Sequence, residues 1–253
     1  MFINNFDPVA IQIFSFEIRW YSLAYISGIL LGWILSKKIF ISNPSIKERF
    51  DDFITFAIIG IILGGRLGYV LFYNFDYYSN NITDALKIWQ GGMSFHGGLI
   101  GVIVASIWFS KKNNQNAFNY LDIVSLVAPI GIFFGRIANF INGELYGKPA
   151  DLPWAVIFPA VDYQGRHPSQ IYEALLEGVL LFLILNLIIR KMSYKKGKCA
   201  ALFLMLYSVF RVLSEFFREP DLQIGYIFNY ISMGSLLSFF MFGIGIIMYF
   251  KIK

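Results

Sequence analysis

Phe53-Ile-Thr-Phe-Ala-Ile-Ile-Gly-Ile-Ile-Leu-Gly-Gly-Arg-Leu-Gly-Tyr-Val-Leu-Phe72 is a run of 20 residues with one charged side chain, Arg66. An α-helix of about 20 apolar residues crosses the hydrocarbon core of a bilayer, so this run predicts a transmembrane helix. Six further runs share its character, and we expect seven spans in an all-α membrane protein: Ile18–Ser36, Phe53–Phe72, His96–Phe109, Tyr120–Ile141, Ser169–Ile189, Cys199–Phe217 and Ile227–Phe250.

The composition excludes most other classes of protein. The chain has 253 residues, of which 57% are hydrophobic and only 15% are charged, whereas a soluble domain carries about 25% charged residues. A single cysteine excludes a disulfide scaffold. The net charge of +5 does not predict a nucleic-acid partner, because the basic residues recur in loops rather than along one face.

The loops predict the orientation. Thirteen Lys and Arg residues follow spans one, three, five and seven, whereas only Lys87, Lys148, Arg166 and Arg218 lie on the opposite side. The positive-inside rule then places the N-terminus outside and the C-terminus in the cytoplasm. We expect one polytopic domain over residues 1–253, with a small extracytoplasmic cap at 142–168.

Four arginines lie in or beside spans: Arg19, Arg66, Arg136 and Arg211. A central Arg costs about 2.5–3.5 kcal/mol on insertion scales, so each needs a partner or an aqueous cavity. For Arg19 and Arg66, near the ends of their spans, a packing role and a functional role are equally expected.

Span six carries a polar stripe. Tyr207, Arg211, Glu215 and Arg218 are spaced at 4, 8 and 11 residues, which places them on one face of a helix. An Arg–Glu pair at this spacing is compatible with a purely structural role. Four polar groups over three turns favour the lining of a wet cavity.

Span four ends in a second polar group. Arg136, Asn139 and Gly143 share one helix face, and a guanidinium beside a carboxamide suits a phosphate or a carboxylate. Glu144 is expected either to orient Arg136 or to cap the turn. At the start of span five, Ser169 is expected as a helix N-cap, and Glu173 and Glu177 place two carboxylates on one face.

The glycines around His96 permit an irregular backbone at membrane depth. A neutral imidazole there suits a base or a hydrogen-bond donor, and a structural histidine is equally compatible with the pattern. Cys199 follows a basic cytoplasmic loop and is expected to be inert. The spaced glycines of three spans predict helix-packing seams: Gly28 and Gly32; Gly60, Gly64 and Gly68; Gly131 and Gly135.

Six blocks resemble the bacterial prolipoprotein diacylglyceryl transferase family. They occur in family order, and we see no departure at their polar positions: Arg19-Trp-Tyr-Ser22, Gly64-Gly-Arg-Leu-Gly68, Phe95-His-Gly-Gly98, Gly135-Arg-Ile-Ala-Asn-Phe-Ile-Asn-Gly-Glu-Leu-Tyr-Gly147, Arg166-His-Pro-Ser-Gln-Ile-Tyr-Glu173 and Tyr207 to Arg218.

The resemblance implies a seven-helix enzyme of the bacterial inner membrane with its active site in the outer half. It implies transfer of the diacylglyceryl group of phosphatidylglycerol to the lipobox cysteine, next to the signal peptide of a preprolipoprotein, with release of glycerol phosphate. It places Arg136 and Arg211 at the lipid, supported by Asn139 and Glu144. It further implies catalytic roles for His96, Arg211, Tyr21, Tyr207 and Glu215.

No metal or organic cofactor is implied, and the partners expected are membrane lipid and the lipoprotein precursor. A transporter or channel for an anionic or lipid substrate is the alternative, because it also places charges within spans. It predicts repeated halves with matched broken helices, which the sequence lacks. A receptor with a structural polar core is a third interpretation.

Overall fold

The computed structural model describes residues 1–14, 16–88, 91–191, 195–220, 226–227 and 231–252. The chain forms two compact units, one of residues 1–36 with 124–253 and one of residues 37–123. A single domain over residues 1–253 stays a prediction.

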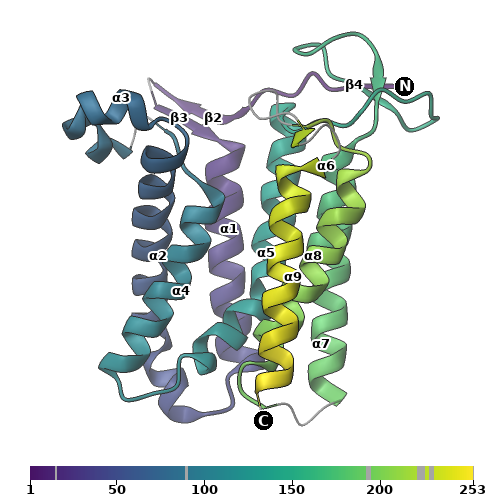
Figure 1. Ribbon diagram of the computed structural model, residues 1–253. Helices are drawn as coiled ribbons and strands as arrows, with labels where there is room; N and C mark the ends of the chain where they lie inside the picture. The colour runs from purple at the N-terminus through teal and green to yellow at the C-terminus, as the bar shows by residue number, and fades with distance from the viewer. Residues whose placement is uncertain (15, 89–90, 192–194, 221–225, 228–230, 253) are drawn as a thin grey trace. The chain divides into compact units, whose positions relative to one another are not determined.

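The first unit is a group of long helices. In Figure 1, α7, α8 and α9 run side by side, and the contacts between α8 and α9 and between α7 and α8 agree with this view. Segments α6, η4 and α7 form one continuous helix from Ser169 to Lys191, and its middle part is π-helical. The helical segments are α1 (Trp20–Leu35), α5 (Phe118–Asn142, from Val124 on in this unit), α6 (Ser169–Glu173), η4 (Ala174–Leu180), α7 (Leu181–Lys191), α8 (Lys198–Glu215) and α9 (Met233–Lys251).

A glycine contact brings α1 against α5. A Cβ atom on Gly28 would lie 2.8 Å from the Cα of Gly131, so only glycine allows this approach. The packing role predicted for these two glycines is confirmed. The same role is wrong for Gly135, because outside the local backbone of α5 no described heavy atom lies within 4 Å of the Cβ position, and no other described glycine approaches Gly135 as Gly28 approaches Gly131.

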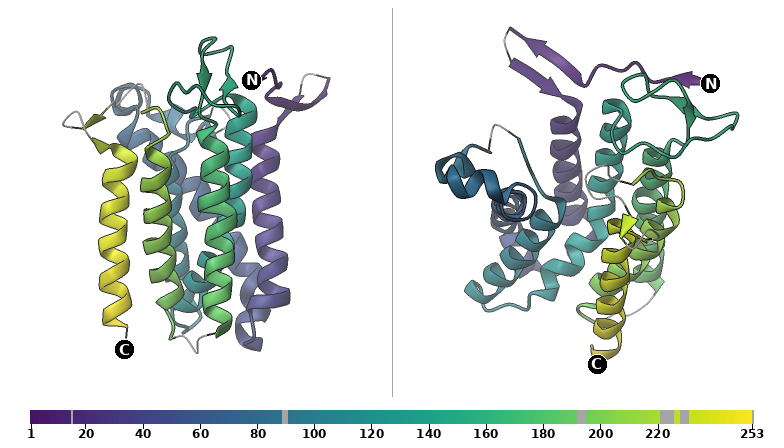
Figure 2. Two further views of the ribbon diagram at one scale, coloured as in Figure 1. Left: turned by 90° about the vertical axis from the view of Figure 1, so that its right-hand side faces the viewer. Right: turned by 45° about the horizontal axis from the view of Figure 1, so that its top comes forward.

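Short strands lie at one end of these helices, which the sequence pattern did not predict. In Figure 2 the N-terminus and the 142–168 segment lie at the same end of the first unit, where β1 pairs with β4 and β4 with β5. Two hairpins precede α1 and α9. The strands are β1 (Phe2–Ile3), β2 (Val9–Ile13), β3 (Phe16–Arg19), β4 (Val156–Ile157), β5 (Gly165–Arg166), β6 (Tyr226–Ile227) and β7 (Ile231–Ser232).

The second unit is built on the pair α2 and α4. A Cβ atom on Gly60 would lie 2.6 Å from the carbonyl oxygen of Gly101, and one on Gly68 would lie 2.9 Å from the Cα of Gly97. Gly64 approaches the carbonyl oxygen of Gly97 even more closely, so the packing seam predicted for span two is confirmed. The segments are η1 (Ser36–Phe40, from Lys37 on in this unit), α2 (Pro44–Phe72), α3 (Phe75–Asn80), η2 (Ile82–Leu86) and α4 (Phe95–Lys112).

Arg66 has a structural role in this unit. Its side chain is buried at 4% exposure. The guanidinium donates to the carbonyls of Asp84 at 2.7 Å, Ala85 at 2.8 Å and Lys87 at 3.1 Å, and to those of Gly91 and Gly92. It therefore ties the segment between α2 and α4 to α2. Arg19, in contrast, is exposed at the end of β3 and pairs with Glu17 at 3.3 Å.

Five helices in the described part of the chain are long and apolar enough to cross a membrane: Trp20–Phe40, Pro44–Phe72, Phe118–Asn142, Ser169–Ile189 and Met233–Lys251. The expectation of a helical membrane protein is confirmed in this coarser form. The remaining two predicted spans are helices α4 and α8, which have the more polar ends Lys111-Lys112 and Arg211 to Glu215.

Two span boundaries are corrected by strands. Span one was predicted from Ile18, but Ile18 and Arg19 lie in β3 and the helix begins at Trp20. Span seven was predicted from Ile227, which lies in β6; residues 228–230 lie outside the described residues, and α9 begins at Met233. Its start is set by Ser232, whose hydroxyl accepts from the backbone N–H of Ser235 at 3.1 Å.

Candidate active site

Two fully buried carboxylates form the centre of the site. Glu173 ends α6 and Glu177 lies on η4, and neither side chain has exposed surface. A π-helical interruption such as η4 is found frequently at functional sites. Because a buried carboxylate is tolerated only when it is paired, the neighbouring helices must supply cations.

Arg136, on α5, contacts both carboxylates. Its Nε lies 2.9 Å from Glu173 Oε2, and its Nη2 lies 2.9 Å from Glu177 Oε2. One planar guanidinium thus bridges the two acids, a geometry that a lysine ammonium does not reproduce. None of these contacts uses Nη1 of Arg136.

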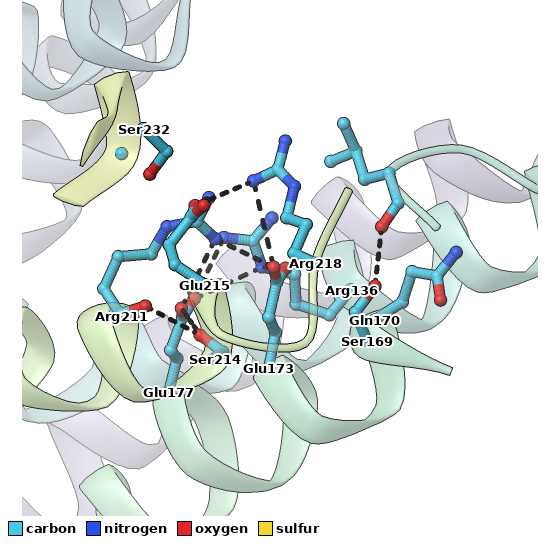
Figure 3. A network of polar contacts seen from close by, with 12 residues as sticks. Arg136, Ser169, Gln170, Glu173, Glu177, Arg211, Ser214, Glu215, Arg218 and Ser232 are labelled. Carbon is cyan, nitrogen blue, oxygen red and sulfur yellow. Dashed lines mark hydrogen bonds and ion pairs between the residues drawn. The ribbon is translucent and has the colours of Figure 1, made fainter. Parts of the chain in front are cut away.

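Arg211, on α8, contacts the same carboxylates (Figure 3). Its Nη1 lies 2.9 Å from Glu173 Oε1 and 3.5 Å from Glu177 Oε1, and its Nη2 donates to Glu215 one turn later on α8. The hydroxyl of Ser214 donates to Glu177 Oε1 at 3.2 Å. The predicted polar stripe of span six therefore faces α6 and η4.

Arg218 completes the group. Its Nη1 lies 3.5 Å from Glu215 Oε1 and 3.8 Å from Glu173 Oε1. Three guanidiniums then balance three carboxylates in a formally neutral arrangement. We call it the charge cluster: Arg136, Glu173, Glu177, Arg211, Glu215 and Arg218. Buried ion pairs add little to stability, so a cluster of this size points to a functional site.

A second network of amides lies at the C-terminal end of α5. The carboxylate of Glu144 accepts from the side-chain amides of Asn139 and Asn142, each at 3.3 Å. The amide of Gln170, itself fully buried, donates to the Glu144 carbonyl at 2.7 Å. Of the two roles expected for Glu144, the contacts favour holding the turn.

The predicted N-cap at Ser169 is wrong. Pro168 occupies that position, and the hydroxyl of Ser169 instead donates to the carbonyl of Leu145 at 2.9 Å. The turn that presents this carbonyl has positive φ at Gly143 (+68°) and at Leu145 (+56°). Ser169 and Gln170 therefore connect α6 to the end of α5, which carries Arg136 and Asn139.

The predicted tyrosines lie on helices of the same unit. Tyr207 is buried one turn before Arg211 on α8, and its ring stacks on Phe203 with centroids 5.8 Å apart. Tyr21 lies in the first turn of α1, and its ring contacts Tyr25 with centroids 5.1 Å apart.

His96 belongs to the second unit. It lies in the first turn of α4, whose N-cap is Ser94; the Ser94 hydroxyl accepts from the backbone N–H of Gly97 at 3.2 Å. The predicted position of His96 at a helix N-terminus is confirmed. The structure thus brings together Arg136, Arg211 and Glu215, with Asn139 and Glu144 in the adjoining network.

Glu173 and Glu177 were not predicted as site residues, although the contacts place them at its centre. The signal was present, because two carboxylates at i, i+4 in an otherwise apolar span are as unusual as the arginines. Arg218 was assigned only to the stripe and the outer loops. Pairing across helices cannot be seen from one sequence, so these partners were missed.

The cap next to the site is held by Arg166. Its guanidinium lies 2.5 Å from Asp162 Oδ2, donates to the carbonyl of Gly147 at 3.0 Å and stacks over Tyr146. The hydrogen bond from Arg166 lowers the pKa of Asp162. Burial, and then the charge of Lys148, lowers the pKa of His167.

Comparison with known proteins assigns the chain to a family. It matches the family described as "Prolipoprotein diacylglyceryl transferase" over residues 8–251. This chain belongs to the prolipoprotein diacylglyceryl transferase family. The membership confirms the resemblance expected from the six sequence blocks and does not favour a transporter or a channel.

Relatives in this family resemble the chain over nearly its whole length. A protein of Azospirillum brasilense is 50% identical over 238 residues, which is 92% of this chain and 89% of the relative. Proteins of Rickettsia bellii (49% identical, 99% and 97% covered) and Rhodospirillum rubrum (48% identical, 96% and 91% covered) are similar. All three are named phosphatidylglycerol–prolipoprotein diacylglyceryl transferase.

Proposed function

We propose that this protein transfers the diacylglyceryl group of phosphatidylglycerol to the thiol of the lipobox cysteine of a preprolipoprotein. The reaction forms a thioether and releases glycerol phosphate. The proposal rests on the charge cluster, in which arginines from two helices meet, in a member of a family whose relatives are named for these substrates.

Arg136 and Arg211 bind the lipid phosphate in this mechanism. A guanidinium has five N–H donors in a planar fork, and it pairs with phosphate in the same bidentate manner as with carboxylate. Both arginines are already oriented by Glu173, so little side-chain entropy is lost on binding. Asn139 and Glu144, in the adjoining network, contact the rest of the headgroup.

The transfer is a substitution at the glyceryl carbon. The cysteine sulfur forms the C–S bond, the C–O bond to phosphate breaks, and its electron pair stays on the phosphate oxygen. The phosphate thus gains negative charge, which Arg136 and Arg211 stabilise. The thiol has an ordinary pKa of about 8.5, so its proton must be removed during or before the attack.

His96 is the proposed acceptor of this proton, and the alternative is that it only shapes the site. Glu215 orients Arg211 through their ion pair. Tyr207 and Tyr21 complete the catalytic set as hydroxyl donors toward the substrate. Replacement of His96 by Gln separates the two roles of the histidine, because only a base gives a rate that recovers with rising pH.

The proposed topology has seven spans, with α4 and α8 added to the five most apolar helices. The N-terminus is outside, the C-terminus is cytoplasmic, and the protein lies in the bacterial inner membrane. The charge cluster lies on the C-terminal parts of α5 and α8, at the junction of α6 with η4, and just after α8. The proposed topology directs these segments toward the outer half of the membrane.

The test is transfer of label. Purified protein is mixed with phosphatidylglycerol labelled in its acyl chains and with a peptide that contains a signal sequence and a lipobox cysteine. Label should appear on this peptide and not on the matched peptide with serine in place of the cysteine. If the purified protein is folded and yet leaves both peptides unlabelled, the proposal is contradicted.

A further inference from the structure

The charge cluster holds as many negative as positive groups, and this balance bears on which anions the site accepts. We propose that Glu173 and Glu177 act as a charge filter. They admit the monoanionic phosphodiester of the donor lipid and disfavour a dianionic phosphomonoester, including the glycerol phosphate that the reaction releases. The inference rests on the proposed function and adds a specificity role for two residues.

The geometry puts both carboxylates next to any bound phosphate. Arg136 contacts Glu173 and Glu177 at 2.9 Å each, and Arg211 contacts them at 2.9 and 3.5 Å. A phosphate held by these two guanidiniums therefore lies close to both carboxylates, because each guanidinium that binds it also contacts Glu173 and Glu177. The repulsion is strong because neither carboxylate is exposed to water, which would screen it.

The chemistry changes the charge of the bound group by one unit. The donor phosphodiester carries one negative charge. After the C–O bond breaks, the phosphate keeps the electron pair, and glycerol phosphate is a monoester with a second pKa of about 6, so it carries nearly two negative charges above pH 7. A cluster without the two carboxylates would bind this product most tightly and retain it.

The Glu residues therefore have two effects. They orient Arg136 and Arg211, as described above, and they limit the affinity of the arginines for excess negative charge. Loss of the first effect weakens the binding of a diester and a monoester alike, whereas loss of the second effect favours the monoester. Glu177→Gln keeps the size and one acceptor oxygen for Ser214 but removes the charge.

The experiment measures competition in vesicles. Transfer of labelled diacylglyceryl from phosphatidylglycerol is measured at pH 8 while an unlabelled competitor with the same acyl chains is added. The competitors are phosphatidylglycerol, a diester, and phosphatidic acid, a monoester. In the wild type, phosphatidic acid should compete about tenfold less well or worse; equal or better competition overturns the proposal without any variant.

In Glu177→Gln the ratio between the inhibitory concentrations of phosphatidic acid and phosphatidylglycerol should fall at least fivefold. Added glycerol phosphate should inhibit this variant at about one tenth of the wild-type concentration. Glu173→Gln tests the same point if Glu177→Gln does not fold. Glu219→Gln is the matched control, since this carboxylate contacts Arg166 at 3.5 Å outside the cluster, and it should behave as the wild type.

A folded Gln variant with an unchanged ratio overturns the filter and leaves the proposed function intact. If the wild-type protein transfers no label at all, in contrast, the proposed function itself is overturned.

Discussion

The two arginines that meet at Glu173 and Glu177 differ in their contacts, and this predicts different kinetic effects. Arg136→Lys keeps the charge but loses the bridge between the carboxylates, so we expect weaker lipid binding, with KM raised about tenfold. Arg211→Lys should lower kcat more than it raises KM, if its contact strengthens as the phosphate leaves.

Transfer rate against phosphatidylglycerol concentration, with purified and folded variants, measures both effects. Wild-type kinetics from both Lys variants would remove these arginines from the mechanism and leave them as structural residues.

Cys199 is expected to be dispensable. It is fully buried in the first turn of α8, 12 residues before Arg211, which corresponds to about 18 Å along a helix. The substrate supplies the reacting thiol, so Cys199→Ser should retain activity within about twofold of the parent, a change of about 0.4 kcal/mol. Loss of transfer by a variant that inserts normally would show that this thiol takes part.

At the scale of elements, the seam between α2 and α4 depends on glycine. A methyl group on Gly60 would lie 2.6 Å from the carbonyl oxygen of Gly101 and 3.0 Å from the Cβ of Ala105. Gly60→Ala should therefore destabilise the protein by about 1–3 kcal/mol, as overpacked cores do. Thermal unfolding in detergent measures the change.

Gly243→Ala is the matched control for this substitution. Gly243 lies in α9, and outside the local backbone of this helix no described heavy atom lies within 4 Å of its Cβ position. Alanine also favours the helix. This variant should be as stable as the parent or slightly more stable. Equal stability of the Gly60 and Gly243 variants would show that α2 and α4 adapt to the added methyl group.

The cap should loosen in acid. The pKa of His167 is lowered by burial and by Lys148, so the folded cap favours the neutral ring, and Nδ1 contacts the Tyr172 hydroxyl at 3.2 Å. The unfolded cap then binds more protons, and the stabilisation present above about pH 6.5 is lost as the pH falls.

Hydrogen exchange of residues 142–168 at pH 7.5 and pH 5.5 measures this effect. His167→Gln should reduce the difference between the two pH values. The same acceleration in the variant would assign the effect to groups other than His167.

At the scale of the whole molecule, the basic residues predict the topology. A reporter fused after Lys253 should lie in the cytoplasm, and one fused before Met1 should lie outside, because 13 basic residues flank one side of the spans and four flank the other. A C-terminal reporter that is active only outside the cytoplasm would reverse the proposed orientation.

Some features were determined by the sequence alone. Apolar runs of this length are too hydrophobic to remain in water, so they predicted membrane-spanning helices. Five described helices are long and apolar enough to be such spans. Arg136 and Arg211 stood out in the sequence because they lie within apolar runs, and an isolated charge in lipid is too costly without a function or a partner. The glycine spacing of span two likewise predicted its packing seam.

Other features were decided only by the tertiary structure. Hydropathy does not distinguish a short strand from the first turn of a helix, so the starts of α1 and α9 were predicted too early. Glu173 and Glu177 join the charge cluster only because α5, α6, η4 and α8 pack together. Their ion pairs with Arg136 and Arg211 join residues that are 34 to 41 positions apart in the sequence, and local sequence spacing does not predict such contacts.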